Sequence, residues 1–335
     1  MGIPIFYDKP FLTYDEQIKY LQEVHKLQIL DENFAKTALK SITYYDLING
    51  YKDCFMEDDK YKDEISLEFL YHFHFLNKSM QTVLFKYSTI IENSYKGKLA
   101  YVLSSSFGEH QDNYLNPNNF HKSHNNNLKF SYIQNKCYEI IARKDVPQPT
   151  KHYLEKHNHI PAWILFKNVT FSNSINLLLL LKPKEQAEVI NLMLPNAKIN
   201  YNEKVEFLIA ALNIIRQYRN TIAHNLNFTT FTAAKDSLKP NSALKFFNSN
   251  LLKTKDVRKN HIGTNDIYSF MLSLLLLLGD NTLRKLMVYE LLGFIESKTP
   301  ESEQIVQSIF NPYFTITKLP SDLAVRLRNY FKFLK

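Results

Sequence analysis

Glycine is the residue whose usage most restricts the fold, since the chain has only 7 glycines among its 335 residues. Nucleotide-binding α/β folds place glycines at the turns that approach phosphate groups. Neither Gly-x-Gly-x-x-Gly nor Gly-x-x-x-x-Gly-Lys occurs in the sequence, which argues against both kinds of nucleotide site. Because 45% of the residues are hydrophobic, the chain can bury a sizeable interior, as one large domain or as two lobes.

Helical periodicity dominates the sequence. Thr13 and Glu16 have the spacing of a capping box, in which two side chains satisfy the backbone N–H groups at the start of a helix. Apolar residues then follow at helical steps, beginning with Ile18 and Leu21. The stretch Asp63–Ser105 predicts one or two long helices. The sequence therefore predicts an all-α fold, a helical bundle with two lobes.

Two polar stretches interrupt the helical pattern. Residues 107–127 are rich in Asn and predict a loop. Asp145–Thr150 contains two prolines, which break helices. We therefore expect an N-terminal helical lobe at residues 1–146 and a second helical lobe at residues 147–335. Within the second lobe, residues 225–262 are rich in Lys and predicted to be irregular.

The segment most suited to chemistry is Arg216–His224. It lies at the end of a predicted helix that begins near Glu203. On a helical wheel Arg216, Asn220 and His224 form a polar ridge with an i, i+4, i+8 spacing, beside a buried apolar stripe. Arg219 flanks this ridge, but lies about 140° away from His224 on an ideal helix. Either the helix ends or bulges before His224, or a second copy supplies its own Arg and His in a composite site of a homodimer.

These residue types allow RNA cleavage without a metal ion. His titrates near neutrality and can move the proton of a 2′-OH or of a leaving 5′-oxygen. Arg stabilises the charge that builds on phosphate, and Asn can hold a phosphate oxygen. By itself, the spacing is better explained by a solvated helix end with a cationic last turn, which the helix dipole favours. We also expect Glu92 to pair with a buried cation, either Lys96 or Lys98.

Three stretches resemble the Abi-like family of bacterial abortive-infection proteins, the AbiD/AbiF class, which carry a HEPN-type ribonuclease motif. They are Lys9–Ile18, Ile42–Tyr51, and Pro161–Trp163 with Thr170–Ser172 followed by Arg216–His224. Their order and spacing match the family over roughly the first 230 residues. The resemblance implies that residues 147–335 form a HEPN-like lobe. Its catalytic residues would be Arg219, Asn220 and His224, with Arg216 assisting.

The resemblance also implies an endoribonuclease toxin that acts in phage defence, restrained by a small structured non-coding RNA. A formal net charge of +8 suits a polyanion partner. Two further sets of side chains are candidates for RNA binding. A solvated loop explains the basic set equally well, and aromatic packing explains the tyrosines better. The sets are the basic residues Lys235, Lys239, Lys245, Lys253, Lys255, Arg258 and Lys259, and the tyrosines Tyr44, Tyr45 and Tyr51.

The remaining features bear on compartment and on other functions. Met1–Asp8 lacks the features of a signal peptide, and the only cysteines, Cys54 and Cys137, show no metal spacing. We expect a cytoplasmic protein with no cofactor and no metal site. No apolar run is long enough to span a bilayer, which disfavours a membrane effector. The alternative to a nuclease is a non-catalytic protein that binds RNA or a partner helix.

Overall fold

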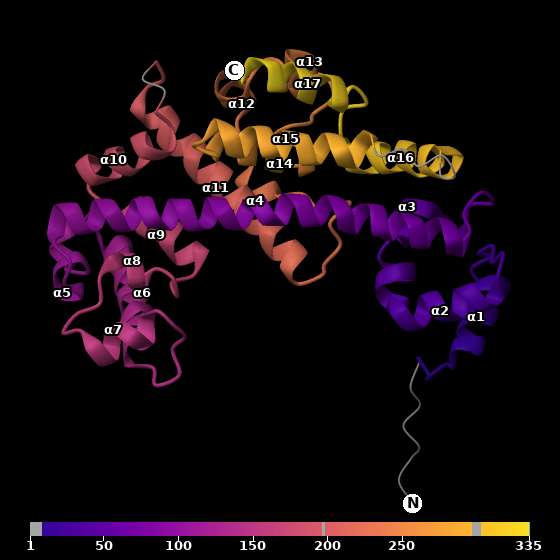
Figure 1. Cartoon of the computed structure of the whole chain (residues 1–335), viewed down its shortest axis with the longest axis horizontal. Coiled ribbons are helices and arrows are strands. Elements are labelled where there is room, and N and C mark those ends of the chain that lie inside the picture. Colours follow the sequence, from indigo (N-terminus) through magenta and orange to yellow (C-terminus); the bar gives the residue numbers. More distant parts are fainter. Residues whose placement is uncertain (1–8, 196–197, 297–302, 335) are drawn as a thin grey trace, which may run out of the picture. The chain divides into compact units, whose positions relative to one another are not determined.

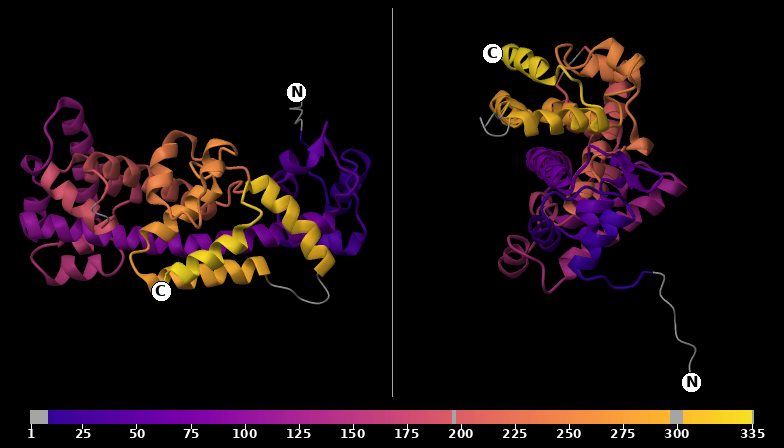
Figure 2. Two further views of the ribbon diagram at one scale, coloured as in Figure 1. Left: turned by 90° about the horizontal axis from the view of Figure 1, so that it is seen from above. Right: turned by 90° about the vertical axis from the view of Figure 1, so that its right-hand side faces the viewer.

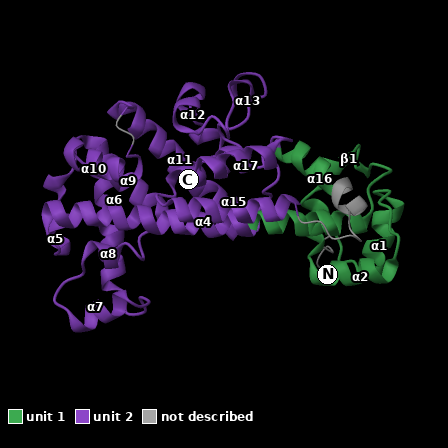
Figure 3. Ribbon diagram, turned by 45° about the horizontal axis from the view of Figure 1, so that its top comes forward, with its two compact units in different colours: residues 1–81, 297–317 green, residues 82–296, 318–335 purple. Residues whose placement is uncertain are grey.

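The computed structural model describes residues 9–195, 198–296 and 303–334, so the N-terminal segment Met1–Asp8 lies outside the described residues. The chain forms two compact units, coloured separately in Figure 3. Unit 1 holds residues 1–81 and 297–317, and unit 2 holds residues 82–296 and 318–335. The predicted lobe boundary after residue 146 falls inside unit 2. The all-α class is confirmed, since a single two-stranded hairpin is the only sheet in the described residues.

Unit 1 consists of short helices, the hairpin and the start of one long helix, α4, whose 41 residues continue into unit 2 (Figure 1). The sequence predicted one or two helices here, and there is one. The elements are α1 (Tyr14–Glu23), α2 (Glu32–Ser41), a π-helical turn (Tyr45–Asn49), α3 (Lys52–Phe55), β1 (Met56–Glu57), β2 (Lys60–Tyr61), α4 (Leu67–Phe107) and α16 (Glu303–Thr317).

The start of α1 confirms the predicted capping box. The backbone N–H of Thr13 donates to the Glu16 carboxylate at 2.7 Å, and the backbone N–H of Glu16 donates to the Thr13 hydroxyl at 3.3 Å. Both bonds satisfy N–H groups that have no partner inside the helix. Ile18 and Leu21 are buried as predicted. The local sequence thus determines where this helix begins and which face it buries.

A buried polar cluster lies in the core of unit 1. The Tyr51 hydroxyl and His74 Nδ1 are hydrogen-bonded at 3.0 Å, and Asn77 Nδ2 donates to the same hydroxyl at 3.2 Å. Tyr51 is therefore a packing residue and does not offer a free ring for stacking. Burial lowers the pKa of His74 to about 4, because the interior disfavours the charged imidazolium.

Unit 2 contains the remaining helices. They are α5 (Gln111–Tyr114), a 3₁₀ turn (Pro117–Asn119), α6 (His124–Ala142), α7 (Thr150–Lys156), α8 (Ala162–Leu165), α9 (Phe171–Leu180), α10 (Pro183–Met193), α11 (Tyr201–Ala223), a second 3₁₀ turn (Ala234–Asp236), α12 (Pro240–Phe246), α13 (Thr254–Arg258), α14 (Ile267–Leu277), α15 (Asn281–Glu296) and α17 (Leu323–Phe333). Among them α17 lies along α15 (Figure 2).

The helix α11 occupies the centre of unit 2 and packs against α9, α10, α12 and α14. The predicted apolar stripe of this helix is confirmed, since Leu208, Leu212 and Ile215 are fully buried. The Tyr218 ring stacks on Phe270 of α14, with centroids 4.9 Å apart and planes 5° apart. The Tyr218 hydroxyl also donates to the carbonyl of residue 231 at 2.8 Å. These contacts determine which way the neighbouring residues of α11 point.

Two predicted loops contain more helix than expected. Residues 107–127 include α5, a 3₁₀ turn and the start of α6, and residues 225–262 include a 3₁₀ turn, α12 and α13. The prediction that these stretches are irregular was wrong at these places. Their helices have only three to seven residues apart from α6, too few for hydrophobic periodicity to reveal. No helix in the described residues is long and apolar enough to cross a membrane.

Candidate functional site

The end of α11 is fixed by the backbone around His224. The helix ends at Ala223, and His224 is the C-cap residue, whose N–H still donates to the Asn220 carbonyl at 3.0 Å. Asn225 then adopts a left-handed conformation with φ of 53°. The N–H of Leu226 returns to the Thr221 carbonyl at 2.9 Å, which closes the helix in the manner of a left-handed C-terminal cap. The exposed His224 side chain therefore stands at a helix end.

This helix end does not by itself bring Arg219 and His224 together. Because the His224 N–H keeps its bond to Asn220, the backbone follows the helical path up to His224. The two residues therefore stay about 140° apart around the axis and about 7.5 Å apart along it. The helix ends one residue before His224, but this end changes the direction only of the residues that follow. The helix thus ends before His224, as the first of the two alternatives has it, although this end alone leaves the two residues on different sides of the axis.

Hydrogen bonds along α11 hold the polar ridge in place. Arg219 Nη1 donates to Asn220 Oδ1 at 3.0 Å, and Arg216 Nε donates to Asn213 Oδ1 at 3.2 Å. All four of these side chains are half-buried, whereas His224 is exposed. Asn220 thus uses its carbonyl oxygen on Arg219, which leaves its amide N–H groups available to an acceptor.

Glu92 on α4 lies against the same segment. Its Oε2 is 3.5 Å from Arg219 Nη2, and its Oε1 accepts a hydrogen bond from Lys96 Nζ at 2.6 Å. The Glu92 and Lys96 side chains are only 12% and 11% exposed. Of the two lysines that the sequence left open as partners of Glu92, Lys96 is the one that pairs with it. The contact with Arg219 was missed, because helical spacing identifies partners on the same helix and not on another helix.

Arg219 has one donor without an acceptor. Its Nε atom is buried and has no hydrogen-bond partner, although the side chain as a whole is 33% exposed. Buried donors in folded proteins are nearly always paired, so an unpaired one calls for an explanation. A guanidinium group presents its donors in a planar fork that fits phosphate oxygens. The charge and the open donor of Arg219 are both suited to an oxyanion.

The basic residues that follow α11 divide into two groups. Lys239 pairs with Glu206 at 2.5 Å, and Lys253 pairs with Asp322 at 2.6 Å. Lys245 likewise pairs with Glu203 at 2.6 Å, and Arg258 Nη2 donates to Asn241 at 3.4 Å. The second group consists of exposed lysines for which the described residues provide no ion pair; these are Lys235, Lys255 and Lys259. The second group is the better candidate for an RNA contact.

The two adjacent tyrosines of unit 1 differ in exposure. Tyr45 begins the π-helical turn and is 70% exposed. Tyr44 is half-buried, and burial raises the pKa of its hydroxyl to about 12. Of the two, only Tyr44 borders a cavity of unit 1.

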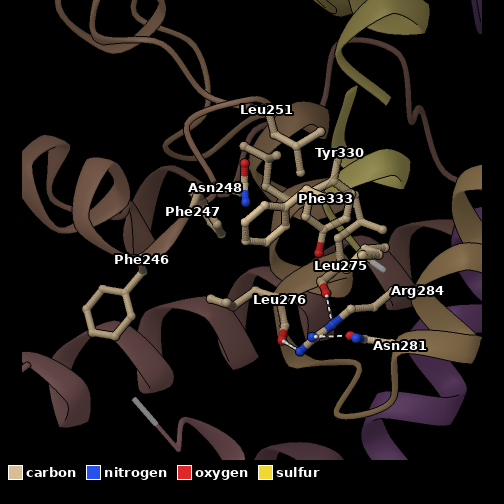
Figure 4. Close-up of a pocket in the computed structure, with 12 residues that line it drawn as sticks. Phe246, Phe247, Asn248, Leu251, Leu275, Leu276, Asn281, Arg284, Tyr330 and Phe333 are labelled. Atoms are coloured by element: carbon tan, nitrogen blue, oxygen red, sulfur yellow. Dashed lines mark hydrogen bonds between the residues drawn. The ribbon is translucent and has the colours of Figure 1, made fainter. Parts of the chain in front are cut away.

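A separate cavity of about 460 Å³ lies in unit 2 between α14, α15, α17 and the residues after α12 (Figure 4). Arg284 borders it, but its guanidinium donates to the carbonyls of Leu275 and Leu276 and to Asn281 Oδ1 at 3.0–3.1 Å. This arginine therefore caps the end of α14. None of the motif residues in Arg216–His224 lines the cavity. In the described residues no group of three or more His, Cys, Asp or Glu side chains could hold a metal ion.

Fold and site together define an all-helical protein with a cationic, Asn- and His-bearing helix end that is braced by a buried carboxylate. The sequence profile of the Abi-like protein family matches residues 37–229. This range is more than half of the chain and includes both Glu92 and His224, and the chain belongs to this family. A search of curated proteins found no match to the chain, and a search of solved structures found none either.

Proposed function

We propose that this protein is a metal-independent endoribonuclease of the HEPN type that acts in abortive-infection defence. Membership of the Abi-like family supports the defence role. The observation that carries the nuclease proposal is the bracing of Arg219 by Glu92 and Asn220, at 3.5 and 3.0 Å, one and a half turns before His224 at the helix end. A cation held in one position can stabilise charge that develops on a scissile phosphate.

Each side chain has a role in this reaction. His224 takes the proton of the 2′-OH as its oxygen attacks the adjacent phosphorus, and the bond to the 5′-oxygen breaks as that oxygen receives a proton from water. Arg219 stabilises the negative charge of the pentavalent transition state at phosphorus. Asn220 donates to a phosphate oxygen, and Arg216 assists in holding the RNA backbone. The products are a 2′,3′-cyclic phosphate and a 5′-hydroxyl. DNA lacks the attacking hydroxyl and is not cut.

We further propose that the active form is a symmetric homodimer in which Arg219 of one copy works with His224 of the other. The support for this is the rotation of about 140° between the two residues on α11. In a two-fold symmetric pair the same surface of each copy meets the other, so one interface forms two identical composite sites. A structured non-coding RNA that restrains the toxin would be a second polyanion partner, which the basic composition accommodates.

The test is cleavage of 5′-labelled single-stranded RNA by the purified protein in EDTA. We expect cutting by the wild type, products that end in a cyclic phosphate, and no cutting by His224→Ala. His124→Ala is the matched control, since His124 is also an exposed histidine of unit 2 but lies on α6. Undiminished cutting by His224→Ala would sink the mechanism. Binding of RNA without any cutting would favour the non-catalytic alternative.

A further inference from the structure

Unit 1 contains a cavity of about 770 Å³ that has no part in the proposed chemistry. Its walls come from the residues just before α1, from α1 itself, from His25 after it, and from the residues around the π-helical turn. The stretches Lys9–Ile18 and Ile42–Tyr51, which are separate in the sequence, therefore meet at this cavity. Its volume lies in the range of about 300–1,000 Å³ that is usual for sites that bind small molecules and cofactors.

Three aromatic rings border the cavity, and each is accessible. Phe11 is 87% exposed, Tyr20 is 41% exposed, and Tyr44 is half-buried. The Tyr20 ring lies at a right angle to the His25 ring, with centroids 5.0 Å apart and planes 87° apart. Accessible ring faces at a concave surface are the means by which proteins stack unpaired bases of RNA.

The polar side chains at the cavity also suit a base and its phosphate. Gln17 Nε2 donates to the Leu12 carbonyl at 2.9 Å, but the buried Gln17 Oε1 has no hydrogen-bond partner. This oxygen is an acceptor that an N–H or O–H group of a ligand could satisfy. Lys9 and His25 border the same cavity, and among the residues that the structure describes no Asp or Glu does so. The cavity thus combines an unpaired acceptor with a lysine at its border.

We propose that this cavity binds one unpaired base of a single-stranded RNA. The base stacks on Tyr44 and Phe11, one of its N–H groups donates to Gln17 Oε1, and Lys9 contacts the adjoining phosphate. A nucleotide joins a flat ring, an N–H donor and a negatively charged phosphate in one unit, and the cavity offers a partner for each. This inference rests on the proposed function only in taking RNA as the ligand, since the catalytic residues are in unit 2.

The experiment measures binding of a fluorescent 12-nucleotide oligoadenylate to the full chain carrying His224→Ala, so that the RNA is not cut. Adding Tyr44→Leu should weaken binding about tenfold, which corresponds to the loss of one stacked base. The matched control is Tyr45→Leu, because Tyr45 is the exposed neighbour that does not border the cavity. Gln17→Met, which removes the open acceptor from α1, should weaken binding as well. Circular dichroism verifies that each variant is folded.

Crosslinking locates the base directly. An oligonucleotide containing 4-thiouridine, irradiated on the protein, should attach to Phe11, Tyr20 or Tyr44. Equal binding by the Tyr44→Leu, Gln17→Met and Tyr45→Leu variants, or crosslinks confined to unit 2, overturns the inference even where the wild type cuts RNA. A specific loss of binding in the Tyr44→Leu and Gln17→Met variants supports it, even where the wild type cuts nothing and the nuclease proposal fails.

Discussion

Arg219 on α11 and Glu92 on α4 form an ion pair, with 3.5 Å between Nη2 and Oε2. The two residues are far apart in the sequence and lie on different helices, so the contact exists only in the folded protein. Glu92 also holds Lys96 at 2.6 Å, and one carboxylate thus orients two cations. The position of the Arg219 guanidinium depends on this carboxylate.

Replacing Glu92 by Gln should slow RNA cutting with little loss of fold. Gln keeps the size of the side chain and can still accept a hydrogen bond from Lys96, but it no longer attracts Arg219 as an anion. A misplaced catalytic group costs up to about a hundredfold in rate, and we expect a fall of that order in kcat at a similar KM. Glu290→Gln is the control, because Glu290 pairs with Lys86 between α15 and α4. An equal effect of both variants would contradict a positioning role for Glu92.

Mixing two inactive variants tests the composite site. Arg219→Ala and His224→Ala should each be inactive alone, whereas an equimolar mixture should regain about a quarter of the wild-type activity. Half of the dimers are then mixed, and each mixed dimer has one site with both residues intact. The measurement is cutting after subunit exchange. A mixture that stays inactive, although exchange is demonstrated, would show that the site lies within one copy.

The left-handed residue after His224 gives a prediction on stability. Asn225 has φ of 53°, a conformation that costs about 1–2 kcal/mol for most residues with a Cβ but little for Asn or Gly. Asn225→Ala should therefore lower the free energy of unfolding by about 1 kcal/mol, and Asn225→Gly should leave it nearly unchanged. Urea unfolding of both variants measures this. A variant pair with equal stability would mean that the helix does not end as described.

The basic residues after α11 give a prediction on salt dependence. Each lysine that neutralises a phosphate of single-stranded RNA contributes about 0.7 to the slope of log affinity against log salt. Changing Lys235, Lys255 and Lys259 to Gln should reduce this slope by about 2. Changing Lys239 and Lys245 should reduce it less, because these two already pair with Glu206 and Glu203. Similar reductions per lysine in the two sets would contradict the division.

The buried histidine of unit 1 predicts a loss of stability in acid. Burial lowers the pKa of His74 from 6.5 to about 4, so the unfolded chain takes up a proton at a pH where the folded ring does not. The folded state is therefore fully favoured above pH 6.5 and loses up to about 3 kcal/mol as the pH falls to 4. His74→Gln should remove this part of the pH dependence. The measurement is the difference in unfolding free energy between the two proteins at pH 7.5 and at pH 4.5.

The sequence could predict what depends on neighbours along the chain. The capping box of Thr13 and Glu16, the apolar face of α11 and the pairing of Glu92 with Lys96 all follow from spacing within one helix. Such features within one helix are determined almost entirely by the order of side chains along it.

What the sequence could not predict depends on packing between distant segments. Nothing in the pattern around Glu92 indicates Arg219 as its partner, and nothing around Tyr44 indicates a cavity shared with Gln17. The helices α12 and α13 are too short to show a period. Ion pairs such as Lys253 with Asp322 likewise join residues that only the fold brings near. The roles of Arg216, Arg219, Asn220 and His224 in catalysis remain predictions.

The unpaired Nε of Arg219 has a thermodynamic consequence. A buried donor without an acceptor makes the free protein less stable than it could be, by about 1–3 kcal/mol. An oxyanion that reaches the guanidinium and allows it to reorient would relieve this loss, and a ligand that binds only the folded state raises the melting temperature. Short RNA that cannot be cut should therefore protect the wild type against heat more than it protects Arg219→Lys. Melting curves would then report contact with the RNA backbone independently of any chemical step.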